Sequence, residues 1–312
     1  MDDPQPYRKA AYSIGKSQFD LVRCRRCDLV YVCPRPTGPT LEAMYDDPDY
    51  YTEGYNLGVE SENYFERRDE LLTQYDQNVA ELEIELGLCE ADIFELGSAG
   101  GFFLEAARRR GHRVRGVELS PVAWRYSVDE LGLDIYRGWL EDAPYEAQGF
   151  DLALADNVLE HTSAPDQVLR DLRRLLRPGA HLVVIVPSYV NSAWYRSMLA
   201  MQRLIPSALL GPQLLKLLKI DQGDGGYPYH ILEFHRTTLL RLIREAGFEI
   251  VSVQGSVPRP AHLFKVANPA MRTRVLRGAF RGVDFLMQRR LAPPARLRVV
   301  ARNPREEPQS PS

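Results

Sequence analysis

The chain has 312 residues, of which 45% are hydrophobic and 26% charged, and its formal net charge is −3. This composition is typical of a soluble globular protein of one large or two modest domains, and the small net charge gives no indication of nucleic-acid binding. No run of about 18 apolar residues predicts a membrane span, and Met1–Pro4 does not begin a signal peptide. Four cysteines do not suggest a disulfide framework, so we expect a cytoplasmic protein.

Residues 1–85 are rich in Tyr, Asp and Arg, and only the later part, from residue 62, has helical spacing. Before it, Phe19–Arg23 and Asp28–Val32 flank a turn and predict a two-stranded hairpin. We expect this first segment to form a partly irregular lid over a second domain.

The predicted hairpin turn contains Cys24 and Cys27, and a Cys-x₂-Cys pair is half of a tetrahedral zinc site. Cys33 could supply a third thiolate, but no fourth ligand is apparent nearby. Two interpretations are therefore open: a zinc site, or a degenerate zinc-ribbon-like segment that is held together by packing. We favour the degenerate segment and predict no bound metal.

From Ala91 onward, strand-like and helical segments alternate, which predicts βαβ units and a parallel sheet. The predicted strands are Asp92–Leu96, Arg113–Glu118, Leu133–Arg137, Phe150–Ala155 and His181–Pro187. The predicted helices between them are Gly101–Arg110, Pro121–Leu131 and Pro165–Leu176. The fold class is therefore α/β and Rossmann-like.

Residues 189–235 interrupt this alternation with a leucine-rich apolar portion and a glycine hinge, and we expect an inserted helical cap there. Three elements follow: a helix at Thr237–Gly247, a strand at Glu249–Val253 and a last strand at Leu297–Ala301. The predicted division is a lid over 1–85, a second domain over 86–302 that includes the cap, and a disordered tail over 303–312.

The stretch from Ile93 to Gly101 is the most informative motif. A short apolar strand containing Glu95 ends in a turn with small residues at Gly97, Ala99 and Gly101. Small residues let a ligand approach the backbone, and the N–H groups that open the next helix attract anionic groups. The turn predicts a nucleotide-like ligand, but the sequence is not the G-x-G-x-x-G of a dinucleotide fold.

Glu118 ends the second predicted strand, 21 residues after Gly97, and is followed by Leu119. A carboxylate in this position can accept hydrogen bonds from both hydroxyls of a ribose. It supports a bound nucleoside without separating a dinucleotide from other nucleoside cofactors.

Several motifs together resemble the class I S-adenosylmethionine-dependent methyltransferases. The first is the acid-x-G-x-A-x-G spacing of Glu95 to Gly101, and later ones are Leu159-Glu160-His161, Pro178-Gly179 and Ala246-Gly247-Phe248. The resemblance covers about half of the chain. It implies a seven-stranded sheet whose last strand is antiparallel and lies beside the sixth, S-adenosylmethionine as the cofactor, and methyl transfer to O, N, C or S.

The resemblance also implies the cofactor-binding residues. They are Glu95, Gly97, Ala99, Gly101, Glu118, Leu119, Trp139, Leu140 and Asn157. Trp139 departs from the family pattern, in which an acidic residue often follows the glycine at this point. Either Trp139 stacks on the adenine while Glu141 or Asp142 makes the polar contact, or Trp139 belongs to the core.

His161 and His230 are the candidate catalytic residues. His161 follows the fourth strand of the predicted sheet, where the reacting end of the cofactor would lie, and a histidine pKa near 6.5 suits proton abstraction. His230 lies between the glycine hinge and the next predicted helix. The competing interpretation of His161 is a structural residue that holds its loop by hydrogen bonds.

We therefore expect a methyltransferase that acts on a hydroxyl of a sugar, glycan or secondary metabolite. The alternatives are an NAD-dependent sugar-modifying enzyme and a non-catalytic S-adenosylmethionine-binding protein. A basic helical segment at 269–291 either packs on the sheet or touches an anionic membrane, and in the latter case the acceptor would be lipid-linked. The oligomeric state is not predicted.

Overall fold

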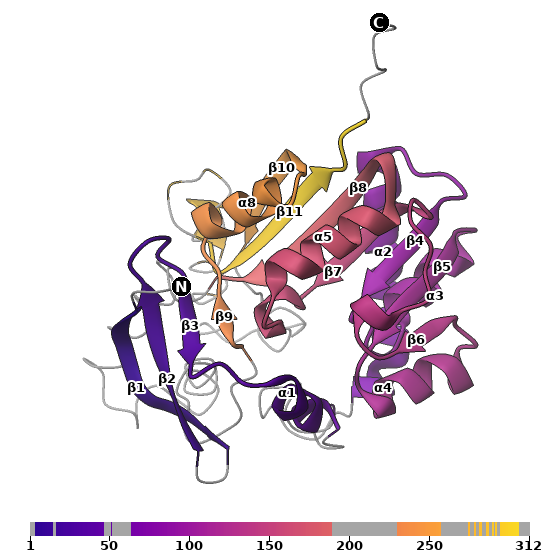
Figure 1. The fold of residues 1–312 in the computed structure, drawn as a ribbon. Helices are drawn as coiled ribbons and strands as arrows, with labels where there is room; N and C mark the ends of the chain where they lie inside the picture. The colour runs from indigo at the N-terminus through magenta and orange to yellow at the C-terminus, as the bar shows by residue number, and fades with distance from the viewer. Residues whose placement is uncertain are drawn as a thin grey trace, which may run out of the picture.

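The computed structural model describes residues 4–14, 17–46, 51, 64–188, 230–256 and 294–305, with isolated positions between 274 and 291. Most of the predicted cap, most of the basic segment at 269–291 and the end of the tail lie outside the described residues. The described strands form a seven-stranded sheet and a separate four-stranded sheet (Figure 1). None of the described helices is long and apolar enough to cross a bilayer.

The seven-stranded sheet has the order β10-β11-β8-β7-β4-β5-β6. Strands β4 to β8 pair in parallel, whereas β11 pairs antiparallel with both β8 and β10. This confirms the predicted antiparallel last strand beside the sixth. The strands are β4 (Asp92–Leu96), β5 (Arg113–Glu118), β6 (Ile135–Arg137), β7 (Phe150–Asp156), β8 (Leu176–Pro187), β10 (Glu249–Ser256) and β11 (Arg296–Arg302).

Helices cover both faces of this sheet, because its central strands carry apolar side chains on both sides. Ile93 and its strand neighbour Phe94 are both fully buried, but they belong to different hydrophobic clusters. The cluster around Phe94 includes helices α5 (Pro165–Leu175) and α8 (Arg236–Glu245). The cluster around Ile93 includes α2 (Arg68–Leu86), α3 (Phe102–Arg109) and α4 (Pro121–Arg125), and a π-helical turn at Tyr126–Glu130 continues α4.

Two strands of the seven-stranded sheet begin at least two residues away from their predicted starts. The third strand begins at Ile135 instead of residue 133, because the Leu133 N–H donates to the Ser127 carbonyl and closes the preceding helical turn. Strand β8 begins at Leu176, five residues before the predicted start. The pairing with β7 shifts in register there, and Gly179 adopts a left-handed φ of 87°.

The four-stranded sheet has the order β1-β2-β3-β9. The predicted hairpin is confirmed as β2 (Ser17–Cys24) and β3 (Val30–Cys33), while β1 (Pro4–Ile14) was not predicted. The fourth strand, β9 (Leu232–Glu233), comes from the end of the segment predicted as a helical cap.

A short segment connects the two sheets. The Ile231 N–H donates to the Glu160 carbonyl at 2.9 Å, and the Ile231 carbonyl accepts from the Val32 N–H at 3.0 Å. The short helix α1 (Gly38–Tyr45) follows the N-terminal sheet and lies beside the seven-stranded one (Figure 1). The N-terminal segment is therefore held against the end of the sheet that carries the predicted site.

Candidate active site

The glycine turn joins β4 to α3 in a backbone conformation that explains its small residues. Gly97, Ala99 and Gly101 have φ values of 68°, 47° and 75°, in the left-handed region. A Cβ on Gly97 would lie 2.7 Å from a Val158 methyl, and one on Gly101 would lie 2.5 Å from a Leu133 methyl. The two glycines are thus required by the packing of the protein itself, in addition to any ligand.

Glu118 folds back toward this turn from the end of β5. Its carboxylate accepts from the Ala99 N–H at 2.7 Å and from the Ser120 N–H at 2.8 Å, and the residue is 4% exposed. Burial raises the pKa of Glu118, while these backbone N–H groups act in the opposite direction. A carboxylate has about four acceptor sites, so Glu118 can hold the turn and still accept ribose hydroxyls.

Glu95 lies at the base of the turn and is also buried, and its Oε2 has no hydrogen-bond partner. Burial raises the pKa of Glu95 well above its usual value, and the nearby carboxylates Asp156 and Glu118 raise it further. A buried carboxyl without a partner is costly, so this position is suited to receive a hydrogen-bond donor or a cation from a ligand.

A cavity of about 510 Å³ opens beside the turn, within the usual range for a small-molecule site. Four predicted cofactor residues line it: Glu95, Gly97, Ala99 and Asn157. The opposite wall comes from α2, and an ion pair between Arg296 and Asp156, 2.6 Å long, borders the cavity. The structure thus brings the first motif and the end of β7 together around one space.

Trp139 and Leu140 follow β6, as predicted, but Trp139 has a partner outside the seven-stranded sheet. Its indole N–H donates to Glu42 Oε1 on α1 at 2.7 Å. Leu140 is buried, whereas Glu141 and Asp142 are exposed. Helix α1 therefore contacts the predicted adenine side of the site.

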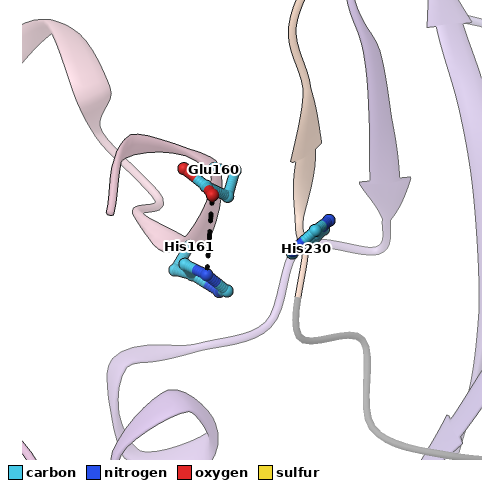
Figure 2. A group of neighbouring side chains, drawn as sticks. All are labelled: Glu160, His161 and His230. Carbon is cyan, nitrogen blue, oxygen red and sulfur yellow. Dashed lines mark ion pairs between the residues drawn. The ribbon is translucent and has the colours of Figure 1, made fainter. Parts of the chain in front are cut away.

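The two candidate catalytic histidines lie together although they are far apart in the sequence. The rings of His161 and His230 meet edge to face, with centroids 5.1 Å apart. His161 belongs to a 3₁₀ turn, η5 (Leu159–His161), that follows β7, and His230 precedes β9 (Figure 2). The Tyr45 ring of α1 packs edge-on to His161 at 6.2 Å.

Glu160 completes this group, which we call the histidine cluster: Glu160, His161 and His230. The Glu160 carboxylate is 0% exposed, and neither of its oxygens has a hydrogen-bond partner. Burial raises the pKa of Glu160 to about 8, while the nearby His230 lowers it. Glu233, also buried, lies with its Oε1 3.7 Å from Nδ1 of His230.

Sequence reasoning did not select three of these groups as site residues. Glu160 was noticed as part of the Leu-Glu-His motif, and its position directly before His161 was the available signal. Glu42 and the Asp156–Arg296 pair carried no such signal, because their contacts join segments 97 and 140 residues apart.

Residues 94–184 match the family described as "Methyltransferase domain". The chain contains a class I S-adenosylmethionine-dependent methyltransferase domain. The matched region runs from the middle of β4 into β8 and includes the glycine turn, Glu118, Asn157 and His161. The methyltransferase family uses S-adenosylmethionine as its methyl donor. The match therefore does not support the alternative of an NAD-dependent sugar-modifying enzyme.

Curated relatives share this methyltransferase domain. The chain is 25% identical over 180 residues to the ubiquinone biosynthesis O-methyltransferase of Cupriavidus pinatubonensis, which covers 56% of this chain and 66% of that protein. It is 31% identical over 103 residues to the enzyme of the same name from Xanthomonas oryzae pv. oryzae, covering 31% and 43%. The similarity thus spans less than two thirds of these relatives.

Among solved structures, the [4+2]-cyclase SpnF resembles the methyltransferase fold of this chain with a TM-score of 0.52. The two are 19% identical, and the alignment covers 87% of this chain and 98% of the cyclase. At this identity the likeness concerns the fold alone.

Proposed function

We propose that the protein transfers the methyl group of S-adenosylmethionine to a hydroxyl of a small molecule. The observation that carries this proposal is the convergence of His161 and His230 next to Glu160. His161 is four residues from Asn157, which lines the cavity beside the glycine turn. Groups that can activate a hydroxyl would thus be close to the reacting end of the cofactor.

In the proposed site, Glu118 binds the ribose, and Gly97, Ala99 and Gly101 let the cofactor approach the backbone. Leu119, Trp139 and Leu140 lie on the adenine side, and Glu95 and Asn157 on the methionine side. This division follows the edge of the sheet from β6 to β7, because the carboxyl ends of parallel strands meet there.

The sulfonium carbon is already electrophilic, so the protein needs mainly to place the acceptor oxygen in line with the carbon–sulfur bond. Removal of the hydroxyl proton adds about 10²–10⁴-fold. We propose that His161 and His230 supply this activation. Both side chains are partly exposed, His161 to 11% and His230 to 27%, so the two rings lie close to solvent as well as to each other.

For the acceptor, we propose a hydroxyl of a sugar, glycan or secondary metabolite. The name of the curated relatives, ubiquinone biosynthesis O-methyltransferase, supports oxygen as the methylated atom. It favours a secondary-metabolite-like acceptor over a sugar. Similarity of fold alone does not set the substrate.

The test is methyl transfer from radiolabelled S-adenosylmethionine to a panel of phenols, sugar nucleotides and polyketide glycosides. We expect labelled product from at least one hydroxyl class and loss of the label when that hydroxyl is blocked. Transfer only to amines, thiols or carbon would contradict an oxygen acceptor.

A second candidate is a protein that binds S-adenosylmethionine without transferring its methyl group. The likeness in fold to a [4+2]-cyclase supports this candidate, because a protein with the same architecture is named for a reaction other than methyl transfer. Tight binding of S-adenosylmethionine with no methyl transfer across the whole panel would support this candidate.

A further inference from the structure

Glu160 is the least satisfied buried group of the histidine cluster. Its side chain is fully buried, yet neither Oε1 nor Oε2 has a hydrogen-bond partner. A buried carboxylate in this state is strongly unfavourable unless a cation or a proton compensates it. The surroundings offer two imidazoles but no lysine or arginine paired with Glu160 among the ion pairs of the described residues.

The geometry of the cluster suits a bound cation. One ligand atom each from Glu160, His161 and His230 lies within 4.8 Å of the others, and His161 Nε2 is 3.8 Å from Glu160 Oε1 (Figure 2). Bonds to a Zn²⁺-sized ion are about 2.1 Å, so ligand atoms around it lie about 3–4 Å apart. Small side-chain rotations would bring the three atoms to this spacing.

We propose that Glu160, His161 and His230 bind a divalent transition-metal ion. Two imidazoles and one carboxylate suit ions such as Zn²⁺ or Mn²⁺, and three protein ligands leave coordination positions open. Across the part of the chain that the structure describes, this is the one group of three such side chains. The sequence predicted no metal here, because His230 is 69 residues from His161 and the motif alone shows two ligands.

Glu233 supports the proposal from the second layer of the site. Its buried Oε1 lies 3.7 Å from Nδ1 of His230, and its Oε2 has no hydrogen-bond partner. Metal-binding histidines commonly donate their second ring N–H to a carboxylate, which orients the ring. Glu233 is placed to do this for His230 when the other nitrogen, Nε2, binds the ion.

The role of the ion rests on the proposed function. The acceptor hydroxyl oxygen would occupy an open position, and coordination would lower its pKa so that its proton leaves to solvent. The oxygen lone pair then forms the new O–CH₃ bond as the carbon–sulfur bond breaks. The electron pair of that bond stays on sulfur, so the products are the methyl ether, S-adenosylhomocysteine and one proton.

The binding test uses the full chain and Mn²⁺, whose free ion gives an electron paramagnetic resonance signal. Mn²⁺ prefers oxygen and nitrogen ligands, so it avoids the thiols of Cys24 and Cys27. We expect one bound Mn²⁺ per chain and at least about tenfold weaker binding in Glu160→Gln and His161→Asn. His181→Asn, on β8 beside Leu152 near the start of β7, is the matched control and should bind like the wild type.

Affinity for S-adenosylhomocysteine serves as the folding check and should be unchanged in all variants. Absence of Mn²⁺ binding, or equal binding in the wild type and Glu160→Gln, would overturn the site. Turnover that survives chelation would overturn the role of the ion. Mn²⁺ binding without methyl transfer to any acceptor would instead contradict the proposed function alone.

Discussion

The glycine turn and the histidine cluster both follow carboxyl ends of the central strands, but they are assembled differently. The turn and its partner Glu118 come from 24 consecutive residues, Glu95 to Glu118, and the Ala99 N–H of the turn donates to the Glu118 carboxylate. The histidine cluster joins a turn after β7 to a segment that also pairs with the N-terminal sheet. The residues proposed to bind the cofactor are therefore close in sequence. The residues proposed to activate the acceptor are brought together only by tertiary structure.

This difference has a functional consequence. The Ile231 backbone connects Glu160 to strand β3 of the N-terminal sheet, so a shift of that sheet would change the spacing of His161 and His230. Among the residues that the structure describes, no backbone hydrogen bond links the glycine turn to the four-stranded sheet, although α1 touches the neighbouring Trp139. Substitutions should therefore separate cofactor binding from turnover.

The largest expected effect is on turnover. His161→Ala removes the activating imidazole, so we expect kcat to fall about 10²–10⁴-fold. Affinity for S-adenosylhomocysteine should stay within about twofold, because the proposed role of His161 is to activate the acceptor and not to bind the cofactor. Steady-state kinetics and calorimetry give both values, and His181→Ala is the control. Equal losses in kcat and in cofactor affinity would show that His161 is structural.

The next effect is on stability. In Gly101→Ala, the new Cβ would lie 2.5 Å from Leu133 on a backbone with φ of 75°, so we expect the free energy of unfolding to fall by about 2–4 kcal/mol. Gly149→Ala is the control, because the nearest atom to its Cβ would be 3.6 Å away. Urea unfolding measures both, and similar values for the two variants would contradict the account of the turn.

A smaller effect is expected on cofactor affinity. Glu118→Ala should weaken binding of S-adenosylmethionine by about 1.5–3 kcal/mol, the contribution of hydrogen bonds to a charged group. Exposed Glu146→Ala is the control and should leave the affinity unchanged. If calorimetry shows full affinity in Glu118→Ala, the ribose binds elsewhere.

The smallest effect concerns the lid. Glu42→Ala removes the acceptor of the Trp139 indole N–H, an exposed hydrogen bond that we expect to contribute about 0.5–1 kcal/mol to cofactor affinity. Exposed Asp129→Ala is the control. A change as large as that of Glu118→Ala would mean that α1 holds the cofactor directly.

The sequence predicted the seven-stranded sheet well, because its strands alternate with helices and each signal lies within a few residues. Its boundaries failed where long-range pairing decides them, as at Leu176, whose partner Phe150 lies on another strand. Strand β1 was not predicted, because its limits are set by its pairing partner and not by a local pattern. Strand β9 was not predicted, because two residues are too few to show a periodicity.

The site shows the same limit. Glu95, Gly97 and Glu118 could be predicted from spacing alone, because each lies at or next to the carboxyl end of a strand of the same sheet. The meeting of His161 with His230, next to the buried Glu160, depends on β9 joining the N-terminal sheet. No local pattern contains that information.

The central claim is that the turn from Glu95 to Gly101 and Glu118 bind S-adenosylmethionine. Titration calorimetry of the full chain with S-adenosylhomocysteine and, separately, with NAD tests it most directly. The account predicts one saturable site for S-adenosylhomocysteine that weakens in Glu118→Ala, and no binding of NAD. Saturable NAD binding without S-adenosylhomocysteine binding would contradict it.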